Sequence, residues 1–217
     1  MYLIDKITTK RLIITAMTLK EMEQLITSTA DSVLNDAYRS MHQGMLEHPD
    51  QLLWYTNWNI CLKESGLSIG GACFKGSPSL NHEVEIGYGI AEKYQNQGFM
   101  SEAVNELCAW AFRHADCFYV QAQTEPLNAS SQKVLEKNHF LRVGVGEEGL
   151  LYELEKPKFT WLPIYILLGL AGGLYLGIAF ERIGYGLAIG FVSGMVFAIT
   201  LNRADQKARI KNSKKSA

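Results

Sequence analysis

The chain has 217 residues, which is enough for one domain of ordinary size with an appendage, and this length excludes a disulfide-stapled miniprotein. Its 21 Lys and Arg, 22 Asp and Glu and 47% hydrophobic residues exclude a disordered chain and a nucleic-acid-binding composition. The charge is unevenly spread, because residues 1–161 hold 14 basic and 20 acidic side chains, net −6, and residues 162–217 hold 7 and 2, net +5. Two different kinds of polypeptide are therefore joined.

The amino terminus has charged residues at positions 5, 6, 10 and 11 and no apolar stretch, so it is not typical of a secretory signal. We expect the bulk of the chain to stay in the cytoplasm. Four cysteines are scattered without a C-x-x-C pair or His residues at zinc spacing: Cys61, Cys73, Cys108 and Cys117. We expect free, mostly buried thiols and no metal, with a redox role as the alternative.

The first half of the chain predicts a strand at 10–16, an amphipathic helix at 18–27 and a second helix at 29–47. Short apolar runs separated by turn residues then predict strands at 58–63, 67–75 and 84–91. The next pattern predicts, in order, a helix at 100–115, a strand at 118–124, a helix at 128–138 and a closing hairpin of strands at 140–145 and 150–155. This order indicates an α/β arrangement with strand–helix–strand crossovers in its second half.

The last part of the chain lacks this alternation. Residues 162–180 and 183–201 are two runs of 19 without a charge, separated by Glu181 and Arg182. As helices at about 1.5 Å per residue, each would reach roughly 28 Å, close to the ~30 Å hydrocarbon core of a bilayer. We therefore predict a globular domain at 1–158, two transmembrane helices within 159–202 and a basic cytoplasmic tail at 203–217.

The alternative is a buried helical hairpin in a soluble oligomer. A domain of this size, with amphipathic helices of its own, leaves little surface to cover two helices that are apolar on every face. Four aromatic residues also suit an interfacial belt: Phe159, Trp161, Tyr165 and Tyr185.

Basic residues flank the two spans unequally. Lys156 and Lys158 precede the first span, the bend offers Arg182 beside Glu181, and six basic residues follow the second span with only Asp205 opposed: Arg203, Lys207, Arg209, Lys211, Lys214 and Lys215. The positive-inside rule then predicts a multi-pass protein of the cell membrane with the globular domain and the C-terminus both cytoplasmic.

Glycine recurs every four residues in both spans, at 169, 173 and 177 in the first and at 186, 190 and 194 in the second, with Ala198 continuing the series. Each helix would therefore present a ridge without side chains, against which another backbone can pack closely. The simplest partner for one ridge is the other, and self-association between chains is a second option. The alternative is that glycine is merely common in membrane helices.

The most informative stretch runs from His82 to Ala103, where a strand leads into a glycine-containing turn that opens directly into a helix. Backbone N–H groups between Gln97 and Ser101 would be unbonded at the positive end of that helix, which is an anion site suited to a pyrophosphate. The turn is neither a Walker loop nor a G-x-G-x-x-G fingerprint. An ordinary strand-to-helix connection is the alternative.

The turn Gln-Asn-Gln-Gly-Phe-Met at 95–100 resembles the Q/R-x-x-G-x-G/A pyrophosphate loop of the GNAT superfamily of acyl-CoA N-acyltransferases. Glu-Ile-Gly-Tyr at 85–88, the segment 128–140 and Thr-Lys-Arg-Leu-Ile-Ile at 9–14 are similar to the branch that includes the ribosomal-protein N-terminal acetyltransferases. The resemblance covers about residues 8–156. Two residues depart from it: Met100 where the family prefers a small residue, and His139 where it usually has glycine, which calls for a positive φ.

The resemblance implies a mixed, mostly antiparallel sheet flanked by helices, followed here by the membrane hairpin. It also implies transfer of an acetyl group from acetyl-CoA to a primary amine, on a protein N-terminus or a small molecule, by direct attack at the membrane surface. Backbone N–H groups near Tyr88 to Ile90 would meet the oxyanion. The implied donor-binding residues are Tyr88, Ile90, Gln95, Asn96, Gln97, Gly98, Phe99, Met100, Ser101 and Asn128. No nucleic-acid partner is expected, and nothing in the sequence selects one acceptor.

An amine that attacks a thioester must lose a proton, so a carboxylate is the expected general base. Glu83 and Glu85 share one strand face and either could serve, but the resemblance favours Glu85, which directly precedes Ile-Gly-Tyr. It also implies Ser131 as the acid that protonates the CoA thiolate, because Leu135 occupies the position where many members have tyrosine. A serine early in a helix is otherwise a capping residue.

The runner-up function is a non-catalytic acyl-CoA-binding sensor anchored to the membrane. The presence of both Glu85 and Ser131 argues against it. A structural membrane adaptor would leave the turn and helix motifs unexplained.

Overall fold

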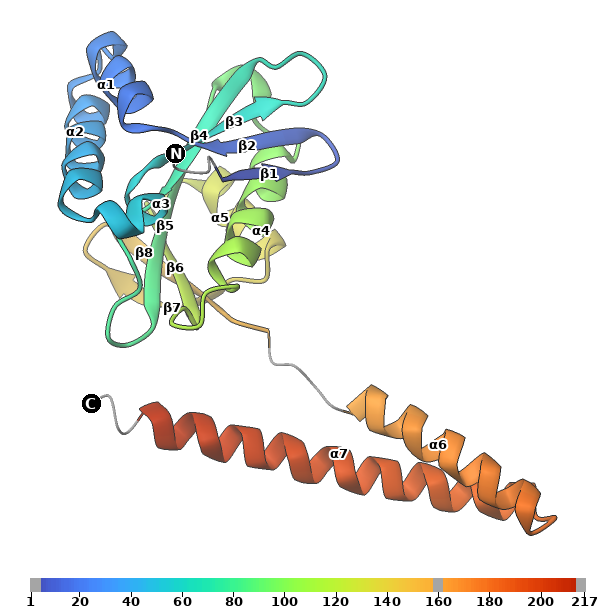
Figure 1. The fold of residues 1–217 in the computed structure, drawn as a ribbon. Helices are drawn as coiled ribbons and strands as arrows, with labels where there is room; N and C mark the ends of the chain where they lie inside the picture. The colour runs from blue at the N-terminus through green and yellow to red at the C-terminus, as the bar shows by residue number, and fades with distance from the viewer. Residues whose placement is uncertain (1–4, 158–161, 214–217) are drawn as a thin grey trace. The chain divides into compact units, whose positions relative to one another are not determined.

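The computed structural model describes residues 5–157 and 162–213, without the side chains of residues 202 and 204–213. The chain divides into two compact units, Met1–Lys156 and Pro157–Ala217 (Figure 1). Each unit has its own architecture, and each is described separately.

The first unit is built on an eight-stranded sheet in the order β1-β2-β3-β4-β5-β6-β8-β7. Neighbouring strands are antiparallel except β5 and β6, which are parallel. The strands are β1 (Lys6–Thr8), β2 (Leu12–Ala16), β3 (Asn57–Leu62), β4 (Ser68–Phe74), β5 (Glu83–Ile90), β6 (Tyr119–Thr124), β7 (Leu141–Gly146) and β8 (Gly149–Glu155).

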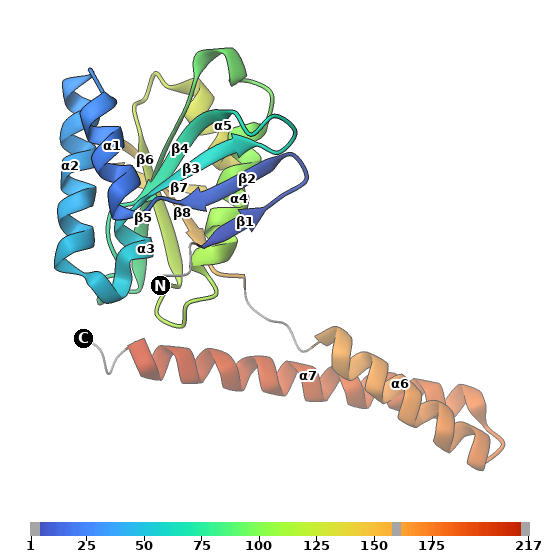
Figure 2. The same cartoon turned by 45° about the horizontal axis from the view of Figure 1, so that its top comes forward.

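Helices cover both faces of this sheet. Helices α1 (Leu19–Ser28) and α2 (Ser32–Glu47) lie on one side, and α4 (Phe99–Ala111) and α5 (Ala129–Lys137) lie on the other (Figure 2). The predicted mixed, mostly antiparallel sheet flanked by helices is thus confirmed. The first strand differs from its prediction, because residues 10–16 contain the turn between β1 and β2. Three short helical segments were not predicted: η1 (Pro49–Gln51), α3 (Leu52–Tyr55) and η2 (Glu92–Tyr94).

Local sequence explains where the main helices begin. Thr18 and Glu21 form a capping box at the start of α1, in which each side chain bonds the backbone N–H of the other residue. Asp31 caps α2, and Asn128 caps α5 by accepting from the Ser131 N–H at 3.0 Å. The predicted apolar stripe of α4 faces the core, where Leu107 is fully buried.

The core between the sheet and α4 is filled by large side chains, including Trp58, Phe74 and Ile86, each at most 2% exposed. The four cysteines are free thiols, as expected; Cys108 and Cys117 are buried, and the other two are partly buried. This unit therefore has a continuous hydrophobic core of its own.

The sheet splits in its middle. β5 pairs with β6 only from Glu83–Tyr119 to Glu85–Gln121. Beyond that point β5 continues along β4 up to Ile90, whereas β6 continues along β8 up to Thr124. A gap therefore opens between the carboxyl-terminal halves of two parallel strands.

The second unit is a helical hairpin of α6 (Leu162–Ala179) and α7 (Ile183–Ser213). Its two glycine ridges face each other, as the sequence predicts: a Cβ added at Gly169 would collide with the carbonyl oxygen of Gly190, and one at Gly173 with that of Gly186. Gly172 and Gly184, which lie off the ridges, have nothing within 4 Å of such a Cβ. The ridge glycines therefore let the two backbones touch.

The turn of the hairpin has a tight geometry. Glu181 takes a left-handed conformation with φ 56°, the Arg182 N–H donates to the Gly177 carbonyl, and the Glu181 N–H donates to the Ile178 carbonyl. This is a Schellman motif, which ends a helix by satisfying its last carbonyls. Only Phe180 and the charged pair Glu181 and Arg182 lie between the two helices.

Large apolar side chains point outward from the hairpin, including Leu167 (67% exposed) and Tyr175 (74% exposed). Both helices are long and apolar enough to cross a membrane, and 11% and 17% of their apolar windows are buried within the chain. α7 continues as helix to Ser213, so the predicted tail begins helical. The predicted belt residues Phe159 and Trp161, with Lys158 and most of the basic tail side chains, lie outside the described residues.

Candidate active site

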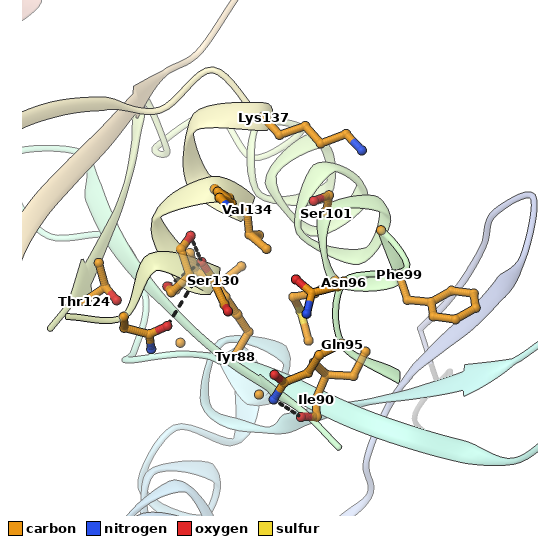
Figure 3. Close-up of a pocket in the computed structure, with 18 of the residues that line it drawn as sticks. Tyr88, Ile90, Gln95, Asn96, Phe99, Ser101, Thr124, Ser130, Val134 and Lys137 are labelled. Carbon is orange, nitrogen blue, oxygen red and sulfur yellow. Dashed lines mark hydrogen bonds between the residues drawn. The ribbon is translucent and has the colours of Figure 1, made fainter. Parts of the chain in front are cut away.

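A cavity of about 960 Å³ opens at the split between β5 and β6 (Figure 3). Its walls come from the second half of β5, the turn before α4, the end of β6 and the first turns of α5. It is therefore lined by backbone that no neighbouring strand covers, together with polar side chains from α5.

One end of the cavity is the turn at the start of α4. Asn96 and Gly98 have positive φ values of 58° and 77°, and Gly98 is the helix N-cap. Glycine has no side chain with which to cap the helix, so the N–H groups of Phe99, Met100 and Ser101 remain unbonded within α4. The predicted anion site thus has the required backbone geometry.

Nine of the ten residues predicted to bind the donor line the cavity: Tyr88, Ile90, Gln95, Asn96, Gly98, Phe99, Met100, Ser101 and Asn128. Gln97 is placed differently. Its carbonyl oxygen accepts from Arg11 Nη1 at 3.0 Å, and its Nε2 donates to the Lys93 carbonyl at 2.9 Å. Gln97 therefore stabilises the turn through these two bonds and does not line the cavity.

Strand alternation explains why β5 contributes backbone groups to the cavity. The Lys75 N–H donates to the Glu85 carbonyl, and the Ala91 N–H donates to the Ile69 carbonyl, so odd-numbered β5 residues bond toward β4. Even-numbered residues therefore bond toward β6. Because β6 pairing stops at Glu85, the N–H groups of Tyr88 and Ile90 face the gap, where an oxyanion could meet them.

Tyr88 and Ser131 form a hydroxyl pair in the cavity wall. The Tyr88 hydroxyl lies 3.0 Å from Ser131 Oγ and donates to the Ser131 carbonyl at 3.3 Å. Burial raises the pKa of Tyr88 to about 12, against the opposing effect of the Ser131 hydrogen bond, so this phenol stays protonated at neutral pH. The alternative that Ser131 is a capping residue is wrong, because Asn128 is the N-cap of α5.

Glu85 lies outside the cavity wall, in a ring of four side chains from different elements. Lys75 Nζ is 2.7 Å from both Glu85 Oε1 and Glu148 Oε2. Gln123 Nε2 donates to Glu85 Oε2 at 3.0 Å, and Gln123 Oε1 accepts from the Glu148 N–H at 3.0 Å. Gln123 and Glu148 line the cavity and connect Glu85 to it.

Lys75 is the positively charged member of this ring and pairs with both carboxylates. Burial disfavours its ammonium, but hydrogen bonds to Glu148 and Glu85 outweigh that effect and raise the pKa of Lys75. Gly146 makes room for the ring, because a Cβ there would collide with Gln123 Oε1. This ring therefore holds an ammonium between two carboxylates.

Glu83 lies on the same strand face as Glu85 but away from the cavity. Burial and the neighbouring Glu153 raise the pKa of Glu83. Tyr88 lies on the opposite strand face, since its hydroxyl reaches Ser131 on α5. Glu85 and Ser131 are thus on opposite faces of the sheet, and the gap between β5 and β6 is the route between them.

The polar residues of the site that sequence reasoning missed include Lys75, Gln123, Lys133, Lys137 and Glu148. Three of these had a usable signal. Lys133 and Lys137 share a face of α5 at i, i+4 spacing, and Gln123 continues the alternation of Gln121 on a strand expected beside β5. Lys75 and Glu148 had none, because their contact joins loops 73 residues apart.

Neither departure from the family pattern distorts the site. His139 takes φ 64°, and the Phe140 N–H donates to the Leu135 carbonyl, which completes the helix ending that glycine usually makes. Met100 is 5% exposed and packs in the core.

Known proteins share this architecture. A family profile described as an acetyltransferase (GNAT) domain matches residues 11–141. An uncharacterized N-acetyltransferase of Bacillus licheniformis, p20, is 32% identical over 109 residues, which is 50% of this chain and 58% of p20. YnaD of Bacillus subtilis is 26% identical over 168 residues, which is 73% of this chain and 93% of YnaD. The match to p20 thus spans less than two thirds of that relative.

Solved structures show the same fold. A ribosomal-protein alanine acetyltransferase from Vibrio fischeri superposes with a TM-score of 0.58 at 15% identity, over 71% of this chain and 98% of that one. RimL, a ribosomal-protein acetyltransferase solved with coenzyme A, gives 0.56 at 20% identity, over 70% and 98%. With the profile match over more than half of its length, the chain belongs to the GNAT acetyltransferase family.

Proposed function

We propose that Met1–Lys156 is a catalytic domain that transfers an acetyl group from acetyl-CoA to a primary amine, and that 162–201 holds it at a membrane surface. The observation that supports this reaction is the cavity at the sheet split, which extends from the turn before α4 to the Tyr88–Ser131 pair. A carboxylate ring adjoins its other end. The proposed donor site and Ser131 thus share one cavity, and Glu85 is linked to it through Gln123.

The pyrophosphate of the donor binds the N–H groups at the start of α4, where the helix dipole favours an anion. The pantetheine arm then extends along the open edge of β5, and the thioester carbonyl meets the N–H of Tyr88 or Ile90. Asn128, at the cavity wall, contacts the arm. RimL crystallised with coenzyme A supports a CoA ligand for this fold.

The amine attacks the thioester carbonyl carbon from the ring side of the gap. Its proton passes to Glu85 once the acceptor has taken the place of Lys75 beside that carboxylate. The carbon–sulfur bond then breaks, and the CoA thiolate takes a proton through the Ser131 hydroxyl, which Tyr88 supports from the same wall. Ser131 regains a proton from water, and Glu85 returns the amine proton to water. An acceptor that arrives as an ammonium suits a ring that already binds one.

The membrane part of the proposal depends on the outward apolar side chains of the hairpin. The glycine ridges of α6 and α7 pack against each other, so Leu167, Tyr175 and their neighbours stay exposed on the outside of the hairpin. These side chains would be buried by an apolar medium around the hairpin. Because basic residues flank the spans, we expect both ends in the cytoplasm by the positive-inside rule. A reporter fused after Ala217 should be cytoplasmic, and a periplasmic reporter would reverse this topology.

The activity is tested with the full chain in lipid nanodiscs. CoA binding is measured by calorimetry, and CoA release is measured against a panel of protein N-terminal peptides, polyamines, amino sugars and lysine peptides. We expect CoA binding and turnover with at least one amine class. Absence of CoA binding contradicts the donor assignment.

A silent acyl-CoA sensor remains the second candidate function. It is favoured by one observation, namely that Lys75 and Gln123 bond both carboxylate oxygens of Glu85. Tight CoA binding without turnover of any acceptor would select the sensor over the enzyme.

A further inference from the structure

Arg11, in the turn between β1 and β2, is the residue of the Thr9–Ile14 motif that the proposed reaction leaves without a role. Its side chain reaches across to the start of α4. Arg11 Nε donates to Glu102 Oε2 at 2.7 Å, and the Arg11 backbone N–H donates to Glu102 Oε1 at 2.9 Å. Its guanidinium carbon lies 4.4 Å from the centre of the Phe99 ring. The bond to Glu102 and the Phe99 ring therefore hold the guanidinium, and the backbone N–H ties the same turn to Glu102.

Glu102 is held in its charged form by this arrangement. Burial alone would raise its pKa, but hydrogen bonds from Thr9 and Arg11 lower the pKa of Glu102 below its usual value. Thr9 Oγ1 donates to the same oxygen, Oε1, at 2.5 Å. The first β-hairpin is thereby joined to the helix whose N-terminus forms the anion site.

The free end of the guanidinium reaches the anion turn itself. Arg11 Nη1 donates to the Gln97 carbonyl at 3.0 Å. The C=O and N–H of a trans peptide point in opposite directions, so holding this carbonyl also fixes the direction of the Gly98 N–H. The bond therefore sets the orientation of one donor of the anion site.

Two cations flank the bare Cα of Gly98. The position that a Cβ would occupy there is 3.5 Å from Arg11 Nη2 and 3.7 Å from Lys137 Nζ. Lys137 extends from α5 along the cavity wall beside this turn (Figure 3). An anion bound over Gly98 would therefore meet unbonded N–H groups and two positively charged side chains.

We propose that Arg11 and Lys137 bind the pyrophosphate of the donor from either side of Gly98, and that Arg11 also positions the turn through the Gln97 carbonyl. This inference rests on the proposed acetyl-CoA donor. It extends the donor site to the first β-hairpin, far from the turn in sequence. It also explains why the turn needs no basic residue of its own.

The test is calorimetry of CoA binding to the full chain in nanodiscs. Arg11→Gln and Lys137→Gln should each weaken CoA binding about tenfold, the usual scale for a hydrogen bond to a charged group. Lys10→Gln removes the same charge from the same turn and should bind CoA as the wild type does. Equal CoA affinity in the wild type and both variants overturns the inference, whereas no binding by the wild type contradicts the donor itself.

Two further measurements separate charge from structural support. Between about 50 and 300 mM NaCl, CoA affinity of Arg11→Gln should fall less steeply than that of the wild type, because fewer charges remain to be screened. A purely structural role would leave this slope unchanged. Dephospho-CoA retains the pyrophosphate, so it should lose affinity by the same factor as CoA; a smaller loss would assign Arg11 to the 3′-phosphate instead.

Arg11→Lys keeps the charge and guards against misfolding of Arg11→Gln. A lysine cannot hold Glu102 and the Gln97 carbonyl in one plane. It should therefore lose affinity about threefold at an unchanged melting temperature. Wild-type affinity in Arg11→Lys together with wild-type affinity in Lys137→Gln would overturn the proposal.

Discussion

The two units are stabilised internally in different ways: the first by packed side chains, and the second by packed backbone. In the first unit, large side chains such as Trp58 and Leu107 are fully buried and the backbone lies around them. In the second unit, backbone packs on backbone at Gly173 and Gly190, while Tyr175 stays 74% exposed. The hydrophobic effect drives side chains inward only in water, so the proposed membrane location of the second unit would account for this difference.

The comparison predicts that chemistry depends on the first unit alone. Glu85→Gln retains the shape of the side chain but cannot accept a proton, so kcat/KM should fall about 10²–10⁴-fold while CoA binding persists. The acidic limb of the pH–rate profile should disappear, with part of the rate recovered at high pH, where the amine arrives deprotonated. Steady-state kinetics over pH, with calorimetry for CoA, measures both.

Glu83→Gln is the matched control on the same strand face, and it should turn over near the wild-type rate. If Glu83→Gln were the damaging change, the base would move two residues along the strand. If neither mattered, the base would be a water chain.

A second substitution tests the role of the backbone N–H groups at the start of α4 in the first unit. Gly98→Glu places an anion where the pyrophosphate approaches N–H groups, at a residue whose φ of 77° already disfavours a side chain. CoA affinity should fall by about tenfold or more through steric exclusion and like-charge repulsion. Gly66→Glu is the control, since Gly66 has φ 69° and open space around its Cα. Unchanged CoA binding by Gly98→Glu would reduce the turn to a connector.

A third change tests the second unit alone. Gly173→Leu forces a side chain against the Gly186 carbonyl, so the helices must separate at a cost of about 1–3 kcal/mol. Gly172→Leu, one position away and off the ridge, should leave the hairpin intact. The cross-linking pattern and assembly state of full-length protein in detergent distinguish the two. Identical patterns for both variants would break the comparison.

The smallest effect is expected from the hydroxyl pair. Ser131→Ala removes the proposed donor, but a thiolate with a pKa near 8.5 leaves fairly well unaided, and the Tyr88 hydroxyl remains 3.0 Å from the vacated position. The rate should therefore fall about tenfold or less. A loss equal to that of Glu85→Gln, measured in the same assay, would give Ser131 a larger part than proton donation.

Patterns confined to one segment were predictable from sequence. Alternation and helical spacing predicted the strands and the longer helices, and the local turn at 95–100 predicted unbonded N–H groups at the start of the following helix. The facing of the glycine ridges also followed, because each helix offers one surface that permits close approach. The short α3 was missed, since four residues show no period.

Contacts between distant segments were not predictable. The Lys75–Glu148 pair and the Arg11–Gln97 bond depend on where loops end in three dimensions, which no residue pattern records. The sheet split likewise follows from β6 turning to pair with β8, not from any residue in β5. The sequence therefore predicted the turn before α4 better than the ring around Lys75.

The three residue pairs between Glu83–Glu85 and Tyr119–Gln121 are also a mechanical feature. They are the strand pairing that joins β1–β5 to β6–β8, so we expect the two parts of the sheet to move relative to each other about this pairing. A ligand bound in the gap should restrain that movement. Amide hydrogen exchange in β5 and β6 should therefore slow when CoA binds, even at residues that the ligand never touches.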